Sequence, residues 1–483
     1  MRHLKSAYTP RRTKIVATLG PASSDEKTLA RMIDAGLDVV RMNFSHGTAK
    51  EHAARVEMVR SLARKAGRAV GVLVDLQGPK IRIGRFKNDR ITLASGDKFV
   101  LDAERKIGDA SGVGLDYKNL PQDVVPGDTL LLDDGRIVLA VTKVQGARIF
   151  TVVEQGGPLS NNKGINRKGG GLTAPALTEK DMQDIKVAAQ LKADYLAVSF
   201  PRSGADIQWA RDLMTKAGGR SLICAKIERA EAIPALAEIL DASDSVMVAR
   251  GDLAVEVGDA VVPALQKRMI RMARERNKIV ITATQMMESM INNPIPTRAE
   301  VSDVANAVLD GTDAVMLSAE TAAGNYPVET IAAMARVCLE AEKEDTFAVE
   351  RRRTDLPESV EEAIARATIF TSNSLNIKAV AALTQSGKTA LLMSRMNTRV
   401  PVYALSSVIE TRRRVTLFRG VYPIMFKGAR NPERALHMAE DELLKRGAVH
   451  RGDYIVLTIG EPFGKAGGTN TMKIVKVGEH RKA

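Results

Sequence analysis

The sequence predicts an α/β protein built on a (β/α)8 TIM barrel, with an inserted small β-barrel lid domain and a C-terminal α/β domain. Two observations predict the barrel: eight short apolar runs recur along the chain, and most are followed by an amphipathic helical pattern. The runs cover residues 14–20, 37–44, 69–76, 194–200, 221–228, 245–251, 278–284 and 314–320. Near-continuous apolar runs are typical of parallel strands covered on both faces. The alternative, an open doubly wound sheet, lacks its usual glycine-rich turn after the first strand.

The third observation is a break in this alternation between about residues 77 and 177. Helical periodicity vanishes there, and short strand patterns alternate with Gly, Pro and Asp turns, which indicates a β-rich insertion. A charged, aperiodic stretch at 342–357 then separates the barrel from a fresh α/β series. We expect a discontinuous barrel over 1–77 and 177–345, a β-rich lid over 78–176 that could close over the barrel mouth, and an α/β domain over 346–483.

The composition of the chain narrows the kinds of molecule that it could bind. The formal charge of +14 comes from 71 Lys and Arg against 57 Asp and Glu, spread along the chain. With one Trp and seven Tyr, the chain offers few aromatics for base stacking, so we expect small anionic substrates rather than nucleic acid. Cys224 and Cys338 lie in apolar stretches and fit free buried thiols of a reducing compartment. No signal region and no membrane-length apolar run is present, so we expect a cytoplasmic protein without membrane association.

Polar side chains gather at the carboxyl ends of the expected strands. They are Arg41, Asn43, Asp75, Lys226, Glu228, Arg250, Asp252, Thr284 and Glu320. In a barrel these ends converge on one mouth, which is the usual active-site face. Any one of them could be an ordinary strand-end residue at solvent, but a set drawn from six strands favours an active site.

Glu228 and Asp252 form a hard oxygen pair from neighbouring strand ends. Such a pair suits Mg²⁺ or Mn²⁺ with open positions for substrate, although two salt-bridged surface acids would look the same in sequence. Lys226 lies two residues before Glu228 and therefore points to the same face of the strand. An ammonium there is suited to hold charge on a transferring phosphoryl group. The rival role, a Schiff base as in class I aldolases, needs a lysine with a lowered pKa.

Two further segments carry chemical signals. Gly251 allows backbone amides to approach an anion, and the Thr284 hydroxyl could pass a proton to a carbon through water.

Residues 384–389 (TQSGKT) follow an expected strand at 379–383 and precede an expected helix at 390–396. This turn resembles the tail of a P-loop but lacks its upstream glycine, so it favours an effector or sugar-phosphate seat. A capped helix without any ligand remains the alternative.

Seven strings along the chain resemble those of the pyruvate kinase family, in the family's order. They are RMNFSHG (41–47), DLQGPKIR (75–82), AKIER (225–229), MVARGDLAVE (247–256), ATQMMESM (283–290), TRAEVSDVANAVLDGTD (297–313) and MLSAETAAGNYP (316–327). The resemblance implies transfer of the phosphoryl group of phosphoenolpyruvate to ADP, giving pyruvate and ATP. It also implies a Mg²⁺ or Mn²⁺ cofactor, a second divalent ion that arrives with the nucleotide, and a homotetramer.

The resemblance also implies residue roles. Lys226 would stabilise the phosphoryl group and the enolate oxygen, Arg41 would grip the phosphate with Arg82 nearby, and Thr284 would lie by the methylene carbon. Glu228 and Asp252 would bind the metal. The substrate carboxylate would be received by the backbone at Ala249, Arg250, Gly251 and Asp252. The nucleotide would be lined by Pro21, Asn43, His46, Arg82 and Lys163.

One departure from the family pattern concerns K⁺. Many members hold K⁺ with residues that match Asn43, Ser45 and Asp75, and carry Glu where this chain has Lys80. With Leu76 and Gln77 just upstream, the combination resembles the branch that needs no monovalent cation. An ammonium near that site would supply the same positive charge covalently, so we expect K⁺ not to be required.

Other departures concern the nucleotide and the effector. Ala323 stands where animal enzymes carry Lys, which puts nucleotide affinity in doubt. The family's effector phosphate seat matches Thr384, Gln385, Ser386, Gly387, Lys388 and Thr389. Residues 460–468 lack the Trp and Arg of enzymes that bind fructose 1,6-bisphosphate, so a sugar monophosphate or AMP is expected instead.

Overall fold

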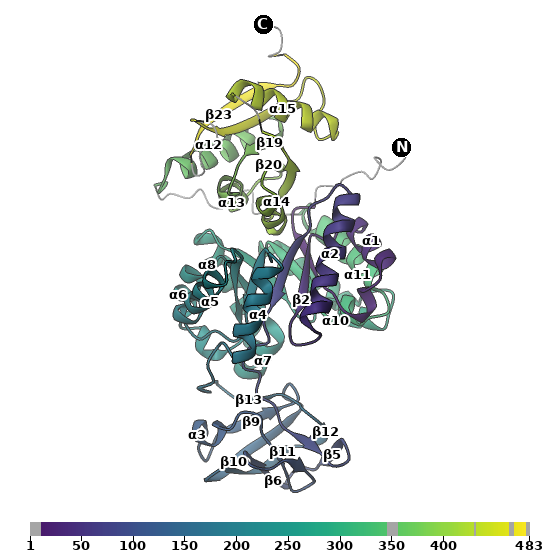
Figure 1. The fold of residues 1–483 in the computed structure, drawn as a ribbon, viewed down its shortest axis with the longest axis vertical. Coiled ribbons are helices and arrows are strands. Elements are labelled where there is room, and N and C mark those ends of the chain that lie inside the picture. Colours follow the sequence, from purple (N-terminus) through teal and green to yellow (C-terminus); the bar gives the residue numbers. More distant parts are fainter. Residues whose placement is uncertain (1–10, 345–355, 429–430, 463–467, 480–483) are drawn as a thin grey trace.

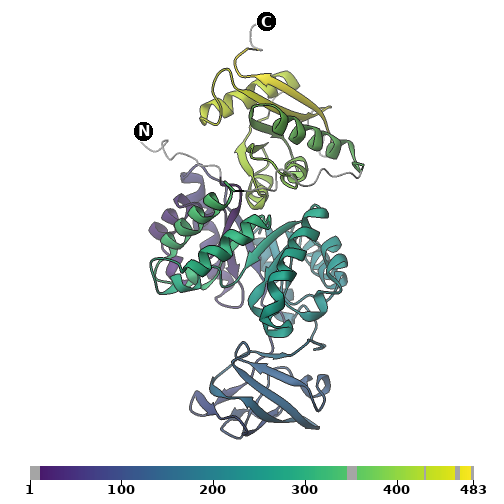
Figure 2. The same ribbon diagram turned by 180° about the vertical axis from the view of Figure 1, so that it is seen from behind.

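The computed structural model describes residues 11–344, 356–428, 431–462 and 468–479. Three bodies follow one another along the long axis of the molecule: a β domain, a central barrel and an α/β domain (Figure 1). Seen from behind, the β domain and the α/β domain again lie at opposite ends of the barrel (Figure 2). None of the described helices is long and apolar enough to cross a membrane.

Eight parallel strands close into a barrel in the order β1-β18-β17-β16-β15-β14-β3-β2. They are β1 (Lys14–Thr18), β2 (Val39–Asn43), β3 (Gly71–Asp75), β14 (Tyr195–Val198), β15 (Leu222–Ile227), β16 (Ser245–Ala249), β17 (Ile279–Ala283) and β18 (Ala314–Leu317). Each lies within one of the eight predicted runs, so the barrel is confirmed. The observed strands are shorter, because the polar residues that follow them belong to the mouth loops; Arg250, for example, already begins a helix.

Helices follow most of the barrel strands, as the amphipathic patterns predict. They are α1 (Glu26–Asp34), α2 (Ala49–Lys65), α4 (Glu179–Gln190), α5 (Gly204–Lys216), α6 (Leu236–Ala242), α7 (Arg250–Val257), α8 (Val262–Glu275), α9 (Arg298–Leu309), α10 (Ala319–Ala322) and α11 (Pro327–Ala341). Helix α2 shows why they begin where they do: the Thr48 side chain accepts from the backbone of Glu51, and the Glu51 side chain accepts from the backbone of Thr48. This reciprocal capping box satisfies two amides that the helix itself leaves unpaired.

The inserted β domain has its own apolar core and is connected to the barrel mouth between β3 and α4. Its strands are β4 (Arg85–Phe86), β5 (Arg90–Leu93), β6 (Lys98–Asp102), β7 (Ile107–Gly108), β8 (Gly112–Gly114), β9 (Thr129–Leu132), β10 (Ile137–Gln145), β11 (Arg148–Gln155), β12 (Gly157–Ser160) and β13 (Ile165–Arg167). Six of them form one sheet, and α3 (Leu120–Asp123) is a single short helix. The β-rich insertion is therefore confirmed.

The C-terminal domain is a five-stranded sheet in the order β21-β20-β19-β22-β23. Its elements are β19 (Ile377–Leu383), β20 (Val402–Ser406), β21 (Val421–Met425), β22 (Tyr454–Gly460), β23 (Thr469–Lys476), α12 (Val360–Ser374), α13 (Lys388–Ser394), α14 (Ile409–Arg414) and α15 (Pro432–Lys445). Strands β20 and β22 are parallel to β19 and flank it on opposite sides. The carboxyl ends of β19 and β22 thus form a topological switch point, where open α/β sheets bind ligands.

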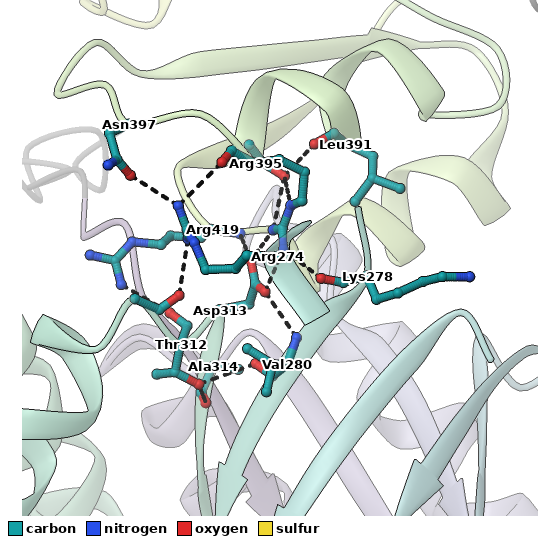
Figure 3. Close-up of polar contacts among 12 residues, drawn as sticks. Arg274, Lys278, Val280, Thr312, Asp313, Ala314, Leu391, Arg395, Asn397 and Arg419 are labelled. Carbon is teal, nitrogen blue, oxygen red and sulfur yellow. Dashed lines mark hydrogen bonds and ion pairs between the residues drawn. The ribbon is translucent and has the colours of Figure 1, made fainter. Parts of the chain in front are cut away.

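The C-terminal domain meets the amino ends of the barrel strands through a buried charged seam (Figure 3). Arg395, which follows α13, donates to Asp313 Oδ2 at 2.8 Å, and both side chains are almost fully buried. Asp313 lies just before β18 and also accepts from the backbone amide of Val280 at 2.9 Å. Arg419 adds a hydrogen bond of 2.9 Å to the carbonyl of Thr312. The seam therefore ties two barrel strands to the C-terminal domain.

Candidate active site

At the barrel mouth, Lys226 lies between two carboxylates. Its Nζ is 3.2 Å from Asp75 Oδ1 and 2.9 Å from Glu228 Oε1, and it donates to Ser199 Oγ at 2.7 Å. All four side chains are buried at the carboxyl ends of β3, β14 and β15. Ser199 is a member of this group that the sequence did not single out. Its signal was available, since it directly follows the fourth predicted strand's apolar core.

The carboxylates decide the protonation state of Lys226. Burial alone lowers the pKa of an ammonium, but the charges of Asp75 and Glu228 outweigh burial and raise the pKa of Lys226 above its ordinary value. Lys226 is therefore a firmly protonated cation at neutral pH. This disfavours the Schiff-base alternative, which needs a neutral amine.

Arg41 is the second cation of the mouth. Its Nε donates to Asp75 Oδ2 at 2.6 Å and its Nη1 to Thr18 Oγ1 at 3.0 Å, so Asp75 orients both Arg41 and Lys226. Burial raises the pKa of Asp75, but Lys226 and Arg41 lower it further than burial raises it. Asp75 therefore stays ionised and presents two cations to one anionic substrate.

Glu228 and Asp252 are the candidate metal ligands. Glu228 Oε2 accepts from the amide of Phe200 at 2.9 Å, and Asp252 lies in the first turn of α7. Burial raises the pKa of Glu228 and Lys226 lowers it, while the charge of Asp252 raises it again, so the net direction is upward. A hard dication between the carboxylates would relieve this repulsion, and the donor set fits Mg²⁺ or Mn²⁺. No group of three or more metal-binding side chains occurs among the described residues.

Lys80 forms an ion pair with a residue outside those that match the family's K⁺ site. Its Nζ lies 3.5 Å from Asp252 Oδ1. Asn43 Oδ1 instead accepts from the amide of Ser45 at 3.1 Å, while Asp75 is occupied by Arg41 and Lys226. In this arrangement of the lid, the ammonium therefore neutralises a candidate metal ligand. Leu76 is buried beside Asp75 and donates its amide to the carbonyl of Ala197.

Thr284 adopts an unusual backbone conformation. Its φ is +68° and that of Gln285 is +52°, a region that β-branched residues rarely occupy. The Thr284 hydroxyl accepts from the amide of Gly251 at 2.8 Å and donates to the carbonyl of Ala283 at 2.6 Å. The turn therefore places a hydroxyl beside the backbone at the start of α7. Such strain is characteristic of functional sites.

Arg250 supports this turn with its side chain. Its guanidinium donates to the Thr284 carbonyl at 2.7 Å and to Asp303 Oδ1 at 2.7 Å. Its guanidinium is thus committed to the loop. The sequence did not indicate Asp303, because it lies on α9 and no local pattern connects it with Arg250.

The expected nucleotide residues are divided between barrel and lid. Pro21 begins a 3-10 turn after β1, and His46 is exposed in the loop after β2. Arg82 and Lys163 lie at the base of the lid, where Arg82 donates to the Asn162 carbonyl at 2.9 Å and Lys163 pairs with Asp133 at 2.7 Å. The described hydrogen bonds and ion pairs of Arg82 and Lys163 therefore lie within the lid.

A second cavity, of about 120 Å³, lies in the C-terminal domain at the switch point. Its lining includes Thr384, Gln385, Ser386, Lys388 and Thr389. Gly387 makes the turn with φ +87° and donates its amide to Thr384 Oγ1 at 2.9 Å. Helix α13 begins at Lys388, two residues earlier than predicted, and has only seven residues. An anion in this cavity would be bound mainly by the hydroxyls of the loop, because helix α13 is short.

Barrel, lid and cationic mouth together define an enzyme that works on phosphorylated substrates beside a divalent cation. Comparison with protein families then gives its identity: "Pyruvate kinase, barrel domain" matches residues 10–331 and "Pyruvate kinase, alpha/beta domain" matches residues 362–475. The chain belongs to the pyruvate kinase family, and its activity is that of a pyruvate kinase.

Curated relatives cover nearly the whole chain. It is 55% identical over 474 residues to "Pyruvate kinase II" of Salmonella typhimurium, covering 97% of this chain and 99% of the relative. It is 54% identical to a "Pyruvate kinase" of Haemophilus influenzae, with 93% and 96% covered, and 43% identical to one of Mycobacterium tuberculosis, with 97% and 99% covered. The sequence similarity therefore spans the barrel, the β domain and the C-terminal domain.

Proposed function

We propose that the buried cluster at the mouth transfers the phosphoryl group of phosphoenolpyruvate to ADP, with Lys226 as the central cation. The observation that carries this proposal is the ammonium of Lys226 held between Asp75 and Glu228. Arg41 binds the phosphate, and Lys226 balances charge first on the phosphoryl group in transfer and then on the enolate oxygen. The backbone of Ala249, Arg250, Gly251 and Asp252 receives the substrate carboxylate.

Glu228 and Asp252 hold Mg²⁺ or Mn²⁺ in this proposal. The bound cation supplies positive charge to substrate oxygens. Thr284 lies in the path of the proton that reaches the methylene carbon of the enolate and completes pyruvate. Lid movement brings Arg82 and Lys163 to the nucleotide, which rests against Pro21, Asn43 and His46. The chemistry is therefore shared among the ends of several barrel strands.

A coupled assay tests the role of Lys226. With phosphoenolpyruvate, ADP and Mg²⁺, Lys226→Met should lose about 1000-fold or more in turnover, because the transferring group loses its main cation. Lys216→Met, at the exposed end of α5, is the matched control and should behave as wild type. Inactive wild-type enzyme would contradict the reaction, whereas an active Lys226→Met variant would contradict only the role of this lysine.

We further propose that the enzyme needs no K⁺. Lys80 supports this, because it already brings a fixed positive charge to the mouth, at 3.5 Å from Asp252. Turnover should be full in Mg²⁺ without K⁺ or NH₄⁺, and Lys80→Glu should create a requirement. A many-fold stimulation of the wild type by KCl at constant ionic strength would overturn this proposal.

The C-terminal cavity is proposed to bind a phosphorylated activator, a sugar monophosphate or AMP. Its hydroxyl-rich loop and its position at the switch point support this. We also propose a cytoplasmic homotetramer. Exposed apolar side chains of the C-terminal domain, such as Phe370 on α12 and Ile474 on β23, are suited to contacts between subunits.

A further inference from the structure

We propose that Glu361 restricts the C-terminal cavity to ligands with one phosphate group and free hydroxyls, and excludes bisphosphates. This inference rests on the proposed effector function of the cavity. It goes beyond that function because it assigns the choice of ligand to one side chain outside the phosphate loop. Glu361 lies in the first turn of α12, 23 positions before Thr384, so no local motif connects the two.

Glu361 is built into the cavity wall. It is only 6% exposed, yet it lines the cavity together with Leu383, Leu405 and Ile459 at the ends of three strands. The first turn of a 15-residue helix stabilises a carboxylate, because the unpaired amides there carry partial positive charge. The fold therefore places a carboxylate in the wall of the cavity.

Without a ligand, the negative charge of Glu361 is balanced by the positive charge of Lys388. Among the described lining residues, the charged side chains are Glu361 and Lys388, and Lys388 Nζ lies 2.9 Å from Glu361 Oε2. Lys388 is mostly exposed, whereas Glu361 is buried. A first phosphate can draw on Lys388 and on the hydroxyls of the loop. A second phosphate on the side of Glu361 would be repelled by its carboxylate.

The same carboxylate favours hydroxyl groups. An ionised carboxylate is an acceptor only, with two oxygens that can each take hydrogen bonds from a sugar hydroxyl. A phosphate monoester of a polyol therefore satisfies both sides of the cavity, with its phosphate at the loop and its hydroxyls at Glu361. In the competing interpretation, Glu361 only anchors Lys388, and its charge has no influence on which phosphate compound binds.

A matched pair of ligands separates these interpretations. Fructose 6-phosphate and fructose 1,6-bisphosphate differ only by the second phosphate, and their binding is measured by calorimetry alongside activation of turnover. Wild type should prefer the monophosphate, and Glu361→Gln should shift the affinity ratio at least about tenfold towards the bisphosphate. Glu362→Gln is the control: Glu362 is equally buried but pairs with Arg366 at 2.7 Å and is not among the lining residues.

The outcomes are distinct. If wild type binds neither sugar phosphate nor inorganic phosphate, the effector function itself is wrong. If wild type binds the monophosphate but Glu361→Gln leaves the ratio unchanged, the role of Glu361 is wrong while the effector function stands. Should Glu361→Gln fold poorly by circular dichroism, Glu361→Asp retracts the charge by one methylene and should shift the ratio in the same direction by a smaller factor. An unchanged ratio in Glu361→Asp would equally contradict the proposal.

Discussion

At the scale of single residues, the molecule contains buried acids whose pKa values are shifted in opposite directions. Asp75 is held ionised by Lys226 and Arg41, which lower its pKa. Glu256, on α7 near the lid connection, has weaker compensation: it accepts from the amide of Ala230 at 2.9 Å and from Asn166 at 3.3 Å. Burial, aided by the charge of Glu231, raises the pKa of Glu256 to about 7.

Glu256 should therefore make stability depend on pH. Because its pKa in the folded protein lies above the 4.5 of an unperturbed glutamate, the folded state binds the proton more tightly, and stability falls as pH rises from about 4.5 to about 7. Glu256→Gln should flatten this slope in urea unfolding between pH 5 and pH 8. The exposed Glu238→Gln should leave the slope as in wild type. An unchanged slope in Glu256→Gln would show that other groups cause it.

At the scale of elements, the seam between barrel and C-terminal domain contains an almost fully buried ion pair between Arg395 and Asp313. Asp313→Asn would leave the guanidinium of Arg395 buried without its countercharge, and we expect a loss of about 3–5 kcal/mol in the free energy of unfolding. Glu340→Gln breaks an ion pair with Lys343 whose members are mostly exposed, and should cost under about 1 kcal/mol. Denaturant titration of both variants compares them; equal losses would mean that burial does not set the value of these pairs.

Elements were also the level at which sequence reasoning worked best. Apolar runs fix the eight barrel strands because parallel strands are covered on both faces, and Thr48 with Glu51 marks the start of α2. The partners of individual side chains could not be predicted from the sequence. The pairing of Arg250 with Asp303 and that of Lys80 with Asp252 join residues that are distant in sequence, and no spacing rule reaches across such distances.

At the scale of the whole molecule, the lid is the body with the thinner attachment. Gly169, Gly170 and Gly171 all have positive φ where the lid returns to the barrel. A Cβ on Gly170 would lie 2.7 Å from a carboxylate oxygen of Glu231. This segment therefore has the properties of a hinge, whereas the seam at the other end of the barrel does not.

Gly170→Ala should disturb the hinge without touching the mouth. We expect a several-fold fall in kcat together with a rise in the KM for ADP, because both depend on lid movement. Gly146→Ala, at a β-turn with φ +58° and open space around it, imposes similar backbone strain away from the hinge and should leave kinetics unchanged. Both variants are compared by steady-state kinetics. Equal changes in kcat and in the KM for ADP would show that general strain in the lid, and not the hinge, causes them.

The two lysines of the mouth have one more consequence. Glu228 holds Lys226 at 2.9 Å and Asp252 holds Lys80 at 3.5 Å, so each candidate metal ligand already has its own counter-ion. A divalent metal held by Glu228 and Asp252 would take over these carboxylates from the two ammonium groups. Lys226 would keep its ion pair with Asp75, so positive charge would remain beside the substrate anion. Metal and substrate should accordingly favour each other's binding.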